Sequence, residues 1–152
     1  MNKLLKIFFA LFVLNGCAYE PLLIKKNYDF YFLEVKSEGE KKINRIIKQR
    51  FKERTNIESV KNYQIFFVSK LNKDIVSSNK KGDPTIYKIS INLNYNLKKD
   101  NNIVFKNEIL KQSTFNNIDD KFELLKYEEN IIENLSGKIA EDILISMASL
   151  TK

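Results

Sequence analysis

The fold is decided by the stretch YKISINLNYNL, residues 87–97, in which apolar and polar side chains alternate without a break. Alternation with a period of two is typical of a β-strand that places one face on a core and the other against water or polar groups. After a turn rich in Asp and Asn at residues 98–102, Ile103 and Phe105 resume the same period. We therefore predict a long β-hairpin over residues 86–115.

Two further strands are expected before this hairpin. Residues 28–35 are rich in aromatic and β-favouring side chains, and residues 63–71 contain an uninterrupted apolar run. Such a run is expected for a strand that is covered on both faces. The polar segment 72–84 is interpreted as a loop, because its Gly and Pro residues interrupt regular structure.

Two amphipathic helices complete the pattern. The first has apolar residues at helical spacing, ends near Thr55, and is expected to begin at a capping box formed by Ser37 and Glu40. The second is capped by Asp120 and runs almost to the C-terminus. At ~1.5 Å per residue it would be about 45 Å long. That length exceeds the predicted hairpin, so we expect a bend near residues 136–137 or a projecting end.

The order β-α-β-β-β-α predicts an α+β fold in which two helices pack on one face of a four-stranded sheet. The first strand, the first helix and the second strand favour a right-handed parallel crossover, so the sheet is expected to be mixed. Residues 28–152 have the length of one domain.

The N-terminal sixteen residues have the three parts of a secretory signal. Lys3 and Lys6 provide positive charge, residues 7–14 are apolar, and Gly16 precedes Cys17, the only cysteine of the chain. The segment resembles a bacterial lipoprotein signal. We predict cleavage after residue 16, an N-acyl diacylglycerol lipid on Cys17, and a lipidated tether over residues 17–27. The alternative is an ordinary secreted protein with a chance cysteine at the cleavage site.

The composition argues against catalysis. The 152-residue chain has no histidine, four glycines and one cysteine, which the predicted acylation would consume. The commonest general base, most transition-metal ligand sets and a glycine-rich phosphate loop are therefore missing. We expect no enzyme activity, no metal and no cofactor beyond the lipid. The formal charge of +7 is modest and forms no evident nucleic-acid stripe, so no nucleic-acid partner is expected.

Three motifs occur in an order that resembles one family. They are CAYEPL at residues 17–22, the DPT of residues 83–85 that leads into the alternating strand, and AEDI at residues 140–143 of the last helix. Together they resemble the LptE family of lipopolysaccharide-assembly lipoproteins across most of the mature chain. The chain departs from the family pattern at Ala18, where glycine is common, and at Leu23, where an aromatic residue is common.

The resemblance implies a noncatalytic lipoprotein on the periplasmic face of the outer membrane of a Gram-negative bacterium. It would plug the LptD β-barrel, assist the assembly of that barrel, and help deliver lipopolysaccharide to the outer leaflet. Ala18 in place of aspartate after the cysteine favours the outer membrane on the resemblance to a bacterial lipoprotein signal. The alternatives are an auxiliary lipoprotein of a lipid-transport ABC system, another barrel-assembly accessory lipoprotein, and a lipid-anchored hydrolase that works without histidine.

Two candidate binding surfaces follow from the expected hairpin. Lys80 and Lys81 precede its first strand, and Lys121 and Lys126 follow its second, so the four ammonium groups are expected at one end, where they would bind the phosphates and acidic sugars of lipopolysaccharide. The asparagines of residues 92–96 would contact the polar interior of a barrel. Solvated loop lysines and water-facing asparagines are the alternatives.

Overall fold

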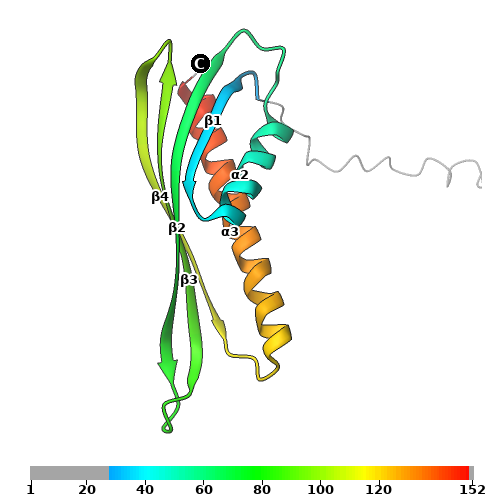
Figure 1. Ribbon diagram of the computed structural model, residues 1–152, viewed down its shortest axis with the longest axis vertical. Coiled ribbons are helices and arrows are strands. Elements are labelled where there is room, and N and C mark those ends of the chain that lie inside the picture. Colours follow the sequence, from blue (N-terminus) through cyan, green and yellow to red (C-terminus); the bar gives the residue numbers. More distant parts are fainter. Residues whose placement is uncertain (1–27, 151–152) are drawn as a thin grey trace, which may run out of the picture.

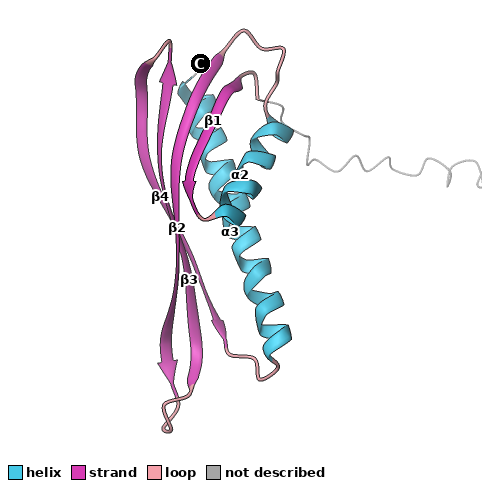
Figure 2. Cartoon of the chain, in the orientation of Figure 1, coloured by secondary structure: helices cyan, strands magenta, loops and turns pink. Residues whose placement is uncertain are grey.

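Residues 28–150 fold into one four-stranded sheet with both of their helices on the same face (Figures 1 and 2). The computed structural model describes residues 28–150, so the predicted leader, Cys17 and tether lie outside the described residues. The predicted α+β fold and element order are confirmed. The elements are β1 (Tyr31–Gly39), α2 (Lys41–Arg54), β2 (Asn62–Ser78), β3 (Pro84–Lys99), β4 (Asn102–Asn116) and α3 (Lys121–Leu150).

The sheet is mixed, as predicted, with the spatial order β1-β2-β3-β4. β1 pairs with β2 in parallel, and the other two pairs are antiparallel. In the register of the sheet, Tyr95 of β3 lies between Phe67 of β2 and Asn107 of β4. Odd-numbered residues of β3 thus face the helices, together with their partners on β2 and β4.

The core lies between the helix-facing side of β3 and the apolar stripes of α2 and α3. Ile91, Leu93 and Leu97 of the alternating stretch are completely buried, and so are Ile47 of α2 and Ile139 of α3. Complete burial of a large aliphatic side chain contributes about 1.5–3 kcal/mol. The strand singled out by its alternation is therefore the one around which the domain packs.

The strands before the hairpin differ from their predicted bounds. β1 begins and ends later than residues 28–35, and β2 continues to Ser78 through most of the segment predicted to be a loop. Only residues 79–83 form the connection. The prediction was wrong because the polar residues of this segment pair with β3: Lys73 lies opposite Ile89 and Asp74 opposite Lys88.

The predicted capping box at the start of the first helix is also wrong. Ser37 belongs to β1, and Glu40 is the N-cap residue but caps through no side-chain hydrogen bond. The backbone N–H of Glu40 instead donates to Oγ of Ser69 on β2 (3.0 Å), and that hydroxyl donates to Oδ1 of Asn44 (2.6 Å). A buried serine on the neighbouring strand therefore fixes the start of α2.

α3 runs as one helix of 30 residues through Ser136 and Gly137. Its predicted cap is confirmed, since Oδ1 of Asp120 accepts hydrogen bonds from the N–H groups of Phe122 (2.8 Å) and Glu123 (3.0 Å). The expected overhang is wrong, because β3 has 16 residues and spans about 53 Å at ~3.3 Å per residue. The sheet is thus as long as the helix.

The two ends of the molecule are built differently (Figure 1). The last pair between β1 and β2 joins Gly39 to Ser69, so β2 continues without β1 as far as Ser78. Only α3 lies over this part, which we call the distal arm: residues 70–92, 110–116 and 121–130. Tyr28 lies at the opposite end, where its backbone N–H donates to the carbonyl of Arg54 (2.8 Å). We call that end the proximal end.

Candidate functional site

Two of the predicted site residues, Lys80 and Lys81, lie in the turn at the tip of the distal arm. Oδ1 of Asn79 accepts hydrogen bonds from the N–H groups of Lys81 (2.8 Å) and Asp83 (3.0 Å), and Gly82 takes the positive φ of 89° that completes the turn. The turn is therefore held by its own side chains, and both lysines are exposed.

Lys121 is brought to the same end of the molecule. The N–H of Asn117 donates to the carbonyl of Thr85 (2.8 Å), which ties the connection before α3 to the start of β3. α3 then begins at Lys121, at the same end of the molecule as the hairpin tip (Figure 1). Lys80, Lys81 and Lys121 are exposed, and within residues 28–150 none of the three is in an ion pair.

Lys126 is on a different side of α3. The carboxylate of Glu128 reaches the sheet, where it pairs with Lys73 of β2. Residues two apart are separated by about 200° around an α-helix. Lys126 therefore lies on the side of α3 away from the sheet, and three of the four predicted lysines lie at the same end of the molecule.

Lys73 is a residue of the distal arm that the sequence analysis missed, because it lay in the predicted loop. Its side chain is on the helix-facing side of β2, with Nζ 4.4 Å from the centre of the Tyr87 ring. Elsewhere in the distal arm, large apolar side chains are exposed on β2 and α3: Ile75 (58%), Val76 (53%), Phe122 (76%) and Leu125 (60%). Cations together with exposed apolar side chains suit an anionic ligand that also has hydrocarbon chains.

On the face of the sheet away from the helices, β3 presents polar side chains, the apolar Phe66, Val68 and Leu110 lie beside them on β2 and β4, and no described element covers this face (Figure 2). Asn92, Asn94 and Asn96 of β3 project there, and the side-chain amide of Asn92 donates to Oε1 of Glu108 on β4. Lys88 pairs with Asp74 on the same face (3.6 Å). The surface offers hydrogen-bond donors and acceptors over three strands, as a polar wall would require.

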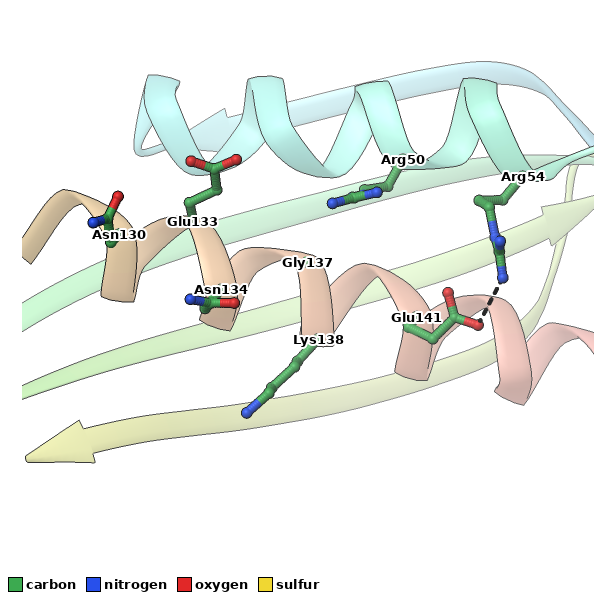
Figure 3. Close-up of a pocket in the computed structure, with 8 residues that line it drawn as sticks. All are labelled: Arg50, Arg54, Asn130, Glu133, Asn134, Gly137, Lys138 and Glu141. Carbon is green, nitrogen blue, oxygen red and sulfur yellow. Dashed lines mark ion pairs between the residues drawn. The ribbon is translucent and has the colours of Figure 1, made fainter. Parts of the chain in front are cut away.

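A cavity of about 770 Å³ lies between α2 and α3 (Figure 3). Arg50 and Arg54 extend into it from α2, and Glu133, Lys138 and Glu141 line it from α3. Arg54 Nη2 lies 3.5 Å from Glu141 Oε1, so part of the charge is neutralised within the cavity. No local sequence pattern indicates this cavity, because its arginines and its carboxylates are about 85 residues apart and meet only when the helices pack.

Tyr28, at the proximal end, contacts Glu141, which lines this cavity. Its hydroxyl donates to Oε1 of Glu141 (2.7 Å). Burial, together with the hydrogen bond to the Glu141 carboxylate, favours the neutral phenol and raises the pKa of Tyr28 to about 12.

The described residues provide neither a cluster of metal ligands nor a membrane-spanning helix. Within residues 28–150, no group of three or more His, Cys, Asp or Glu side chains is placed to hold a metal ion. No helix in this part of the chain has the length and apolar character needed to cross a bilayer.

Solved structures of bacterial lipoproteins share this architecture. Rare lipoprotein B from Shewanella oneidensis superposes with a TM-score of 0.61 at 14% identity, covering 78% of this chain and 96% of that one. Lipoprotein B from Nitrosomonas europaea gives 0.64 at 14% identity, covering 82% and 88%. A minor lipoprotein from Acinetobacter baumannii gives 0.59 at 6% identity, covering 82% and 93%.

Comparison at the level of sequence finds no such relationship. No protein-family profile and no curated protein sequence matches this chain. The low identities to the solved structures establish a shared fold and nothing finer. The chain therefore has the fold of these bacterial lipoproteins.

Proposed function

We propose that this chain is an outer-membrane lipoprotein of the LptE type, anchored through an acylated Cys17. It plugs the LptD β-barrel, assists assembly of that barrel, and helps deliver lipopolysaccharide to the outer leaflet without catalysing a reaction. The observation that carries the proposal is the shared fold, which spans 96% of the Shewanella oneidensis rare lipoprotein B. The LptE-like motifs of the sequence point the same way.

The tip of the distal arm supports a role in lipopolysaccharide binding. Lipopolysaccharide combines phosphates and acidic sugars with acyl chains. Lys80, Lys81 and Lys121 provide point charges for the anionic groups, and the exposed Leu125, one helical turn after Lys121, provides apolar surface. The attraction acts between exposed charges and therefore weakens as salt is added.

The polar side chains of β3 on the outer face of the sheet support the role of a plug. The wall inside a large outer-membrane barrel is polar. The asparagine row of β3 and its neighbours on β4 can exchange hydrogen bonds with such a wall, while the two helices keep the apolar core on the other side of the sheet.

Charge reversal at the tip tests lipopolysaccharide binding. We expect Lys80→Glu with Lys81→Glu to lower the lipopolysaccharide retained by the purified protein by roughly tenfold at low salt, since each exposed charge contributes up to about 1 kcal/mol. The matched control is Lys70→Glu with Lys106→Glu, which makes the same charge change at exposed positions of the sheet. Equal retention by both variants would count against the tip as the binding site.

Recovery of the acylated protein from membranes tests the partner. We expect a very large β-barrel protein to co-purify with it in stoichiometric amount. Co-purification with an ABC transporter would support the auxiliary-lipoprotein alternative instead. A stably membrane-bound protein that is recovered without any barrel would contradict the proposal.

A further inference from the structure

Four cations form a continuous line along α2. Lys41, Arg45, Lys48 and Lys52 are spaced by four, three and four residues, which places them one above another on a single side of an α-helix. All four side chains are exposed. We call this line the basic stripe.

The basic stripe is distinct from the cations that hold the two helices together. Lys42 pairs with Glu129 of α3 (2.9 Å), and Arg54 pairs with Glu141 (3.5 Å). Among residues 28–150, by contrast, no carboxylate forms an ion pair with a member of the basic stripe. The charge of the stripe is therefore left for a partner outside the domain.

Apolar surface adjoins the stripe where α2 ends. A hollow of about 160 Å³ is lined by Phe32, Val35 and Phe51, with Lys48, Lys52 and Ile57 among its other lining residues. In the loop that follows α2, Ile57 is 82% exposed and Val60 is 92% exposed. Side chains of this kind are the ones that insert between lipid headgroups.

The loop that carries Ile57 and Val60 is fixed in place. The N–H of Asn56 donates to the carbonyl of Phe30 (2.9 Å), and the hydroxyl of Ser59 donates to the carbonyl of Asp29 (3.1 Å). Ser59 itself is buried. The two apolar side chains are thus held outward by buried hydrogen bonds at the proximal end, beside Tyr28, where the described domain begins.

We propose that the basic stripe, with Ile57 and Val60, binds an anionic phospholipid surface. Its cations attract the phosphate groups, and the two apolar side chains insert at the headgroup level. A membrane at the proximal end is also the arrangement that the proposed acyl anchor requires, because residue 28 follows the predicted tether directly.

Binding to vesicles without the acyl anchor tests this surface. The chain used is residues 18–152, which keeps the whole described core, since all its buried apolar residues lie between Tyr28 and Met147. The probe is a vesicle of phosphatidylethanolamine with a minority of phosphatidylglycerol, and the readout is co-sedimentation at low salt. We expect binding that disappears when phosphatidylglycerol is omitted.

Matched charge variants locate the binding surface. A triple substitution to Gln should weaken the partitioning of the protein onto vesicles by about 100-fold; it changes Arg45, Lys48 and Lys52. Each cation near an anionic membrane contributes about fivefold to the partition coefficient. The control changes Lys70, Lys106 and Lys138 to Gln, which removes the same charge from exposed positions elsewhere. Equal weakening by the two triple variants would overturn the proposal, because it would mean that only net charge matters.

The apolar contribution has its own pair of variants. Ile57→Ser should weaken vesicle binding several-fold, whereas Leu110→Ser, which changes a 58% exposed side chain on the outer face of the sheet, should not. Two further results would overturn the proposal: equal binding to vesicles without phosphatidylglycerol, and binding to duplex DNA as strong as binding to vesicles. No barrel and no lipopolysaccharide are present, so failure here is distinct from failure of the proposed function.

Discussion

The hydroxyl of Tyr28 donates a 2.7 Å hydrogen bond to the carboxylate of Glu141, which lies 113 residues later in the chain. Tyr28 is the first residue of the described domain, and Glu141 lies on α3 opposite Arg54 of α2. One contact thus joins the beginning of the domain to both helices. Tyr28 is therefore attached to the helical layer before β1 begins.

This contact predicts a change of stability at high pH. The pKa of Tyr28 is raised from the ordinary value of 10.0 to about 12, so the unfolded chain releases this proton before the folded protein does. The free energy of unfolding should therefore fall as the pH rises from about 10 to about 12. Denaturant titrations across this range should show a shallower fall for Tyr28→Phe than for the wild type. Identical pH dependence of the two proteins would contradict the assignment.

Gly39 should be irreplaceable at the junction between β1 and α2. It has a φ of +91°, and a Cβ there would lie 1.9 Å from the carbonyl oxygen of Ser69. We expect Gly39→Ala to cost at least about 2 kcal/mol, from backbone strain together with the clash. Gly82→Ala is the matched control, since its φ is +89° but no atom lies within 4 Å, and about 1 kcal/mol of strain is expected. Equal losses of unfolding free energy would show that the clash is relieved.

Ser69 should contribute more to stability than a buried serine without partners. Ser69→Ala leaves the N–H of Glu40 without its hydroxyl acceptor and Oδ1 of Asn44 without its donor. The expected loss is about 1–3 kcal/mol of unfolding free energy. Ser78→Ala, at the exposed end of the same strand, should change the unfolding free energy by less than about 0.5 kcal/mol. A loss at Ser69 as small as the loss at Ser78 would remove this serine as the anchor of α2.

Tyr95 presents the opposite case. Its ring is 1% exposed, and its hydroxyl has no hydrogen-bond partner among the described residues. Removal of an unpaired buried hydroxyl relieves its desolvation cost. Tyr95→Phe should therefore leave the melting temperature unchanged or raise it, whereas Tyr28→Phe should lower it at neutral pH. A clear destabilisation by Tyr95→Phe would reveal a partner for this hydroxyl.

The sequence predicted those parts of the fold in which one local pattern is sufficient. The alternation of residues 87–97 requires a strand with one buried face, and the Asp120 cap requires only the next three residues of the chain. The second half of β2 has no such local pattern, because Lys73 and Asp74 form a strand only through pairing with β3. Composition alone could not reveal that partner.

The candidate sites divide in the same way. Hairpin geometry correctly placed Lys80, Lys81 and Lys121 at one end, because antiparallel strands determine which loops meet. Lys126 was misplaced because its direction depends on the rotation of α3, which the pair between Lys73 and Glu128 reveals. The cavity between the helices depends on how two distant segments pack, and no local pattern carries that information.

β1 ends at its pair with Ser69, so the distal arm is a part of the sheet whose length sets how far the tip lies from the proximal end. From Ser69 to Ser78, β2 extends about 30 Å at ~3.3 Å per residue, with no second helix to constrain its length. Removal of two residues from each strand would shorten it by ~6.6 Å, close to the ~5.4 Å of one turn of α3. A deletion of two residues from each strand together with one turn of α3 would therefore shorten the distal arm and leave the half that contains Tyr28 unchanged.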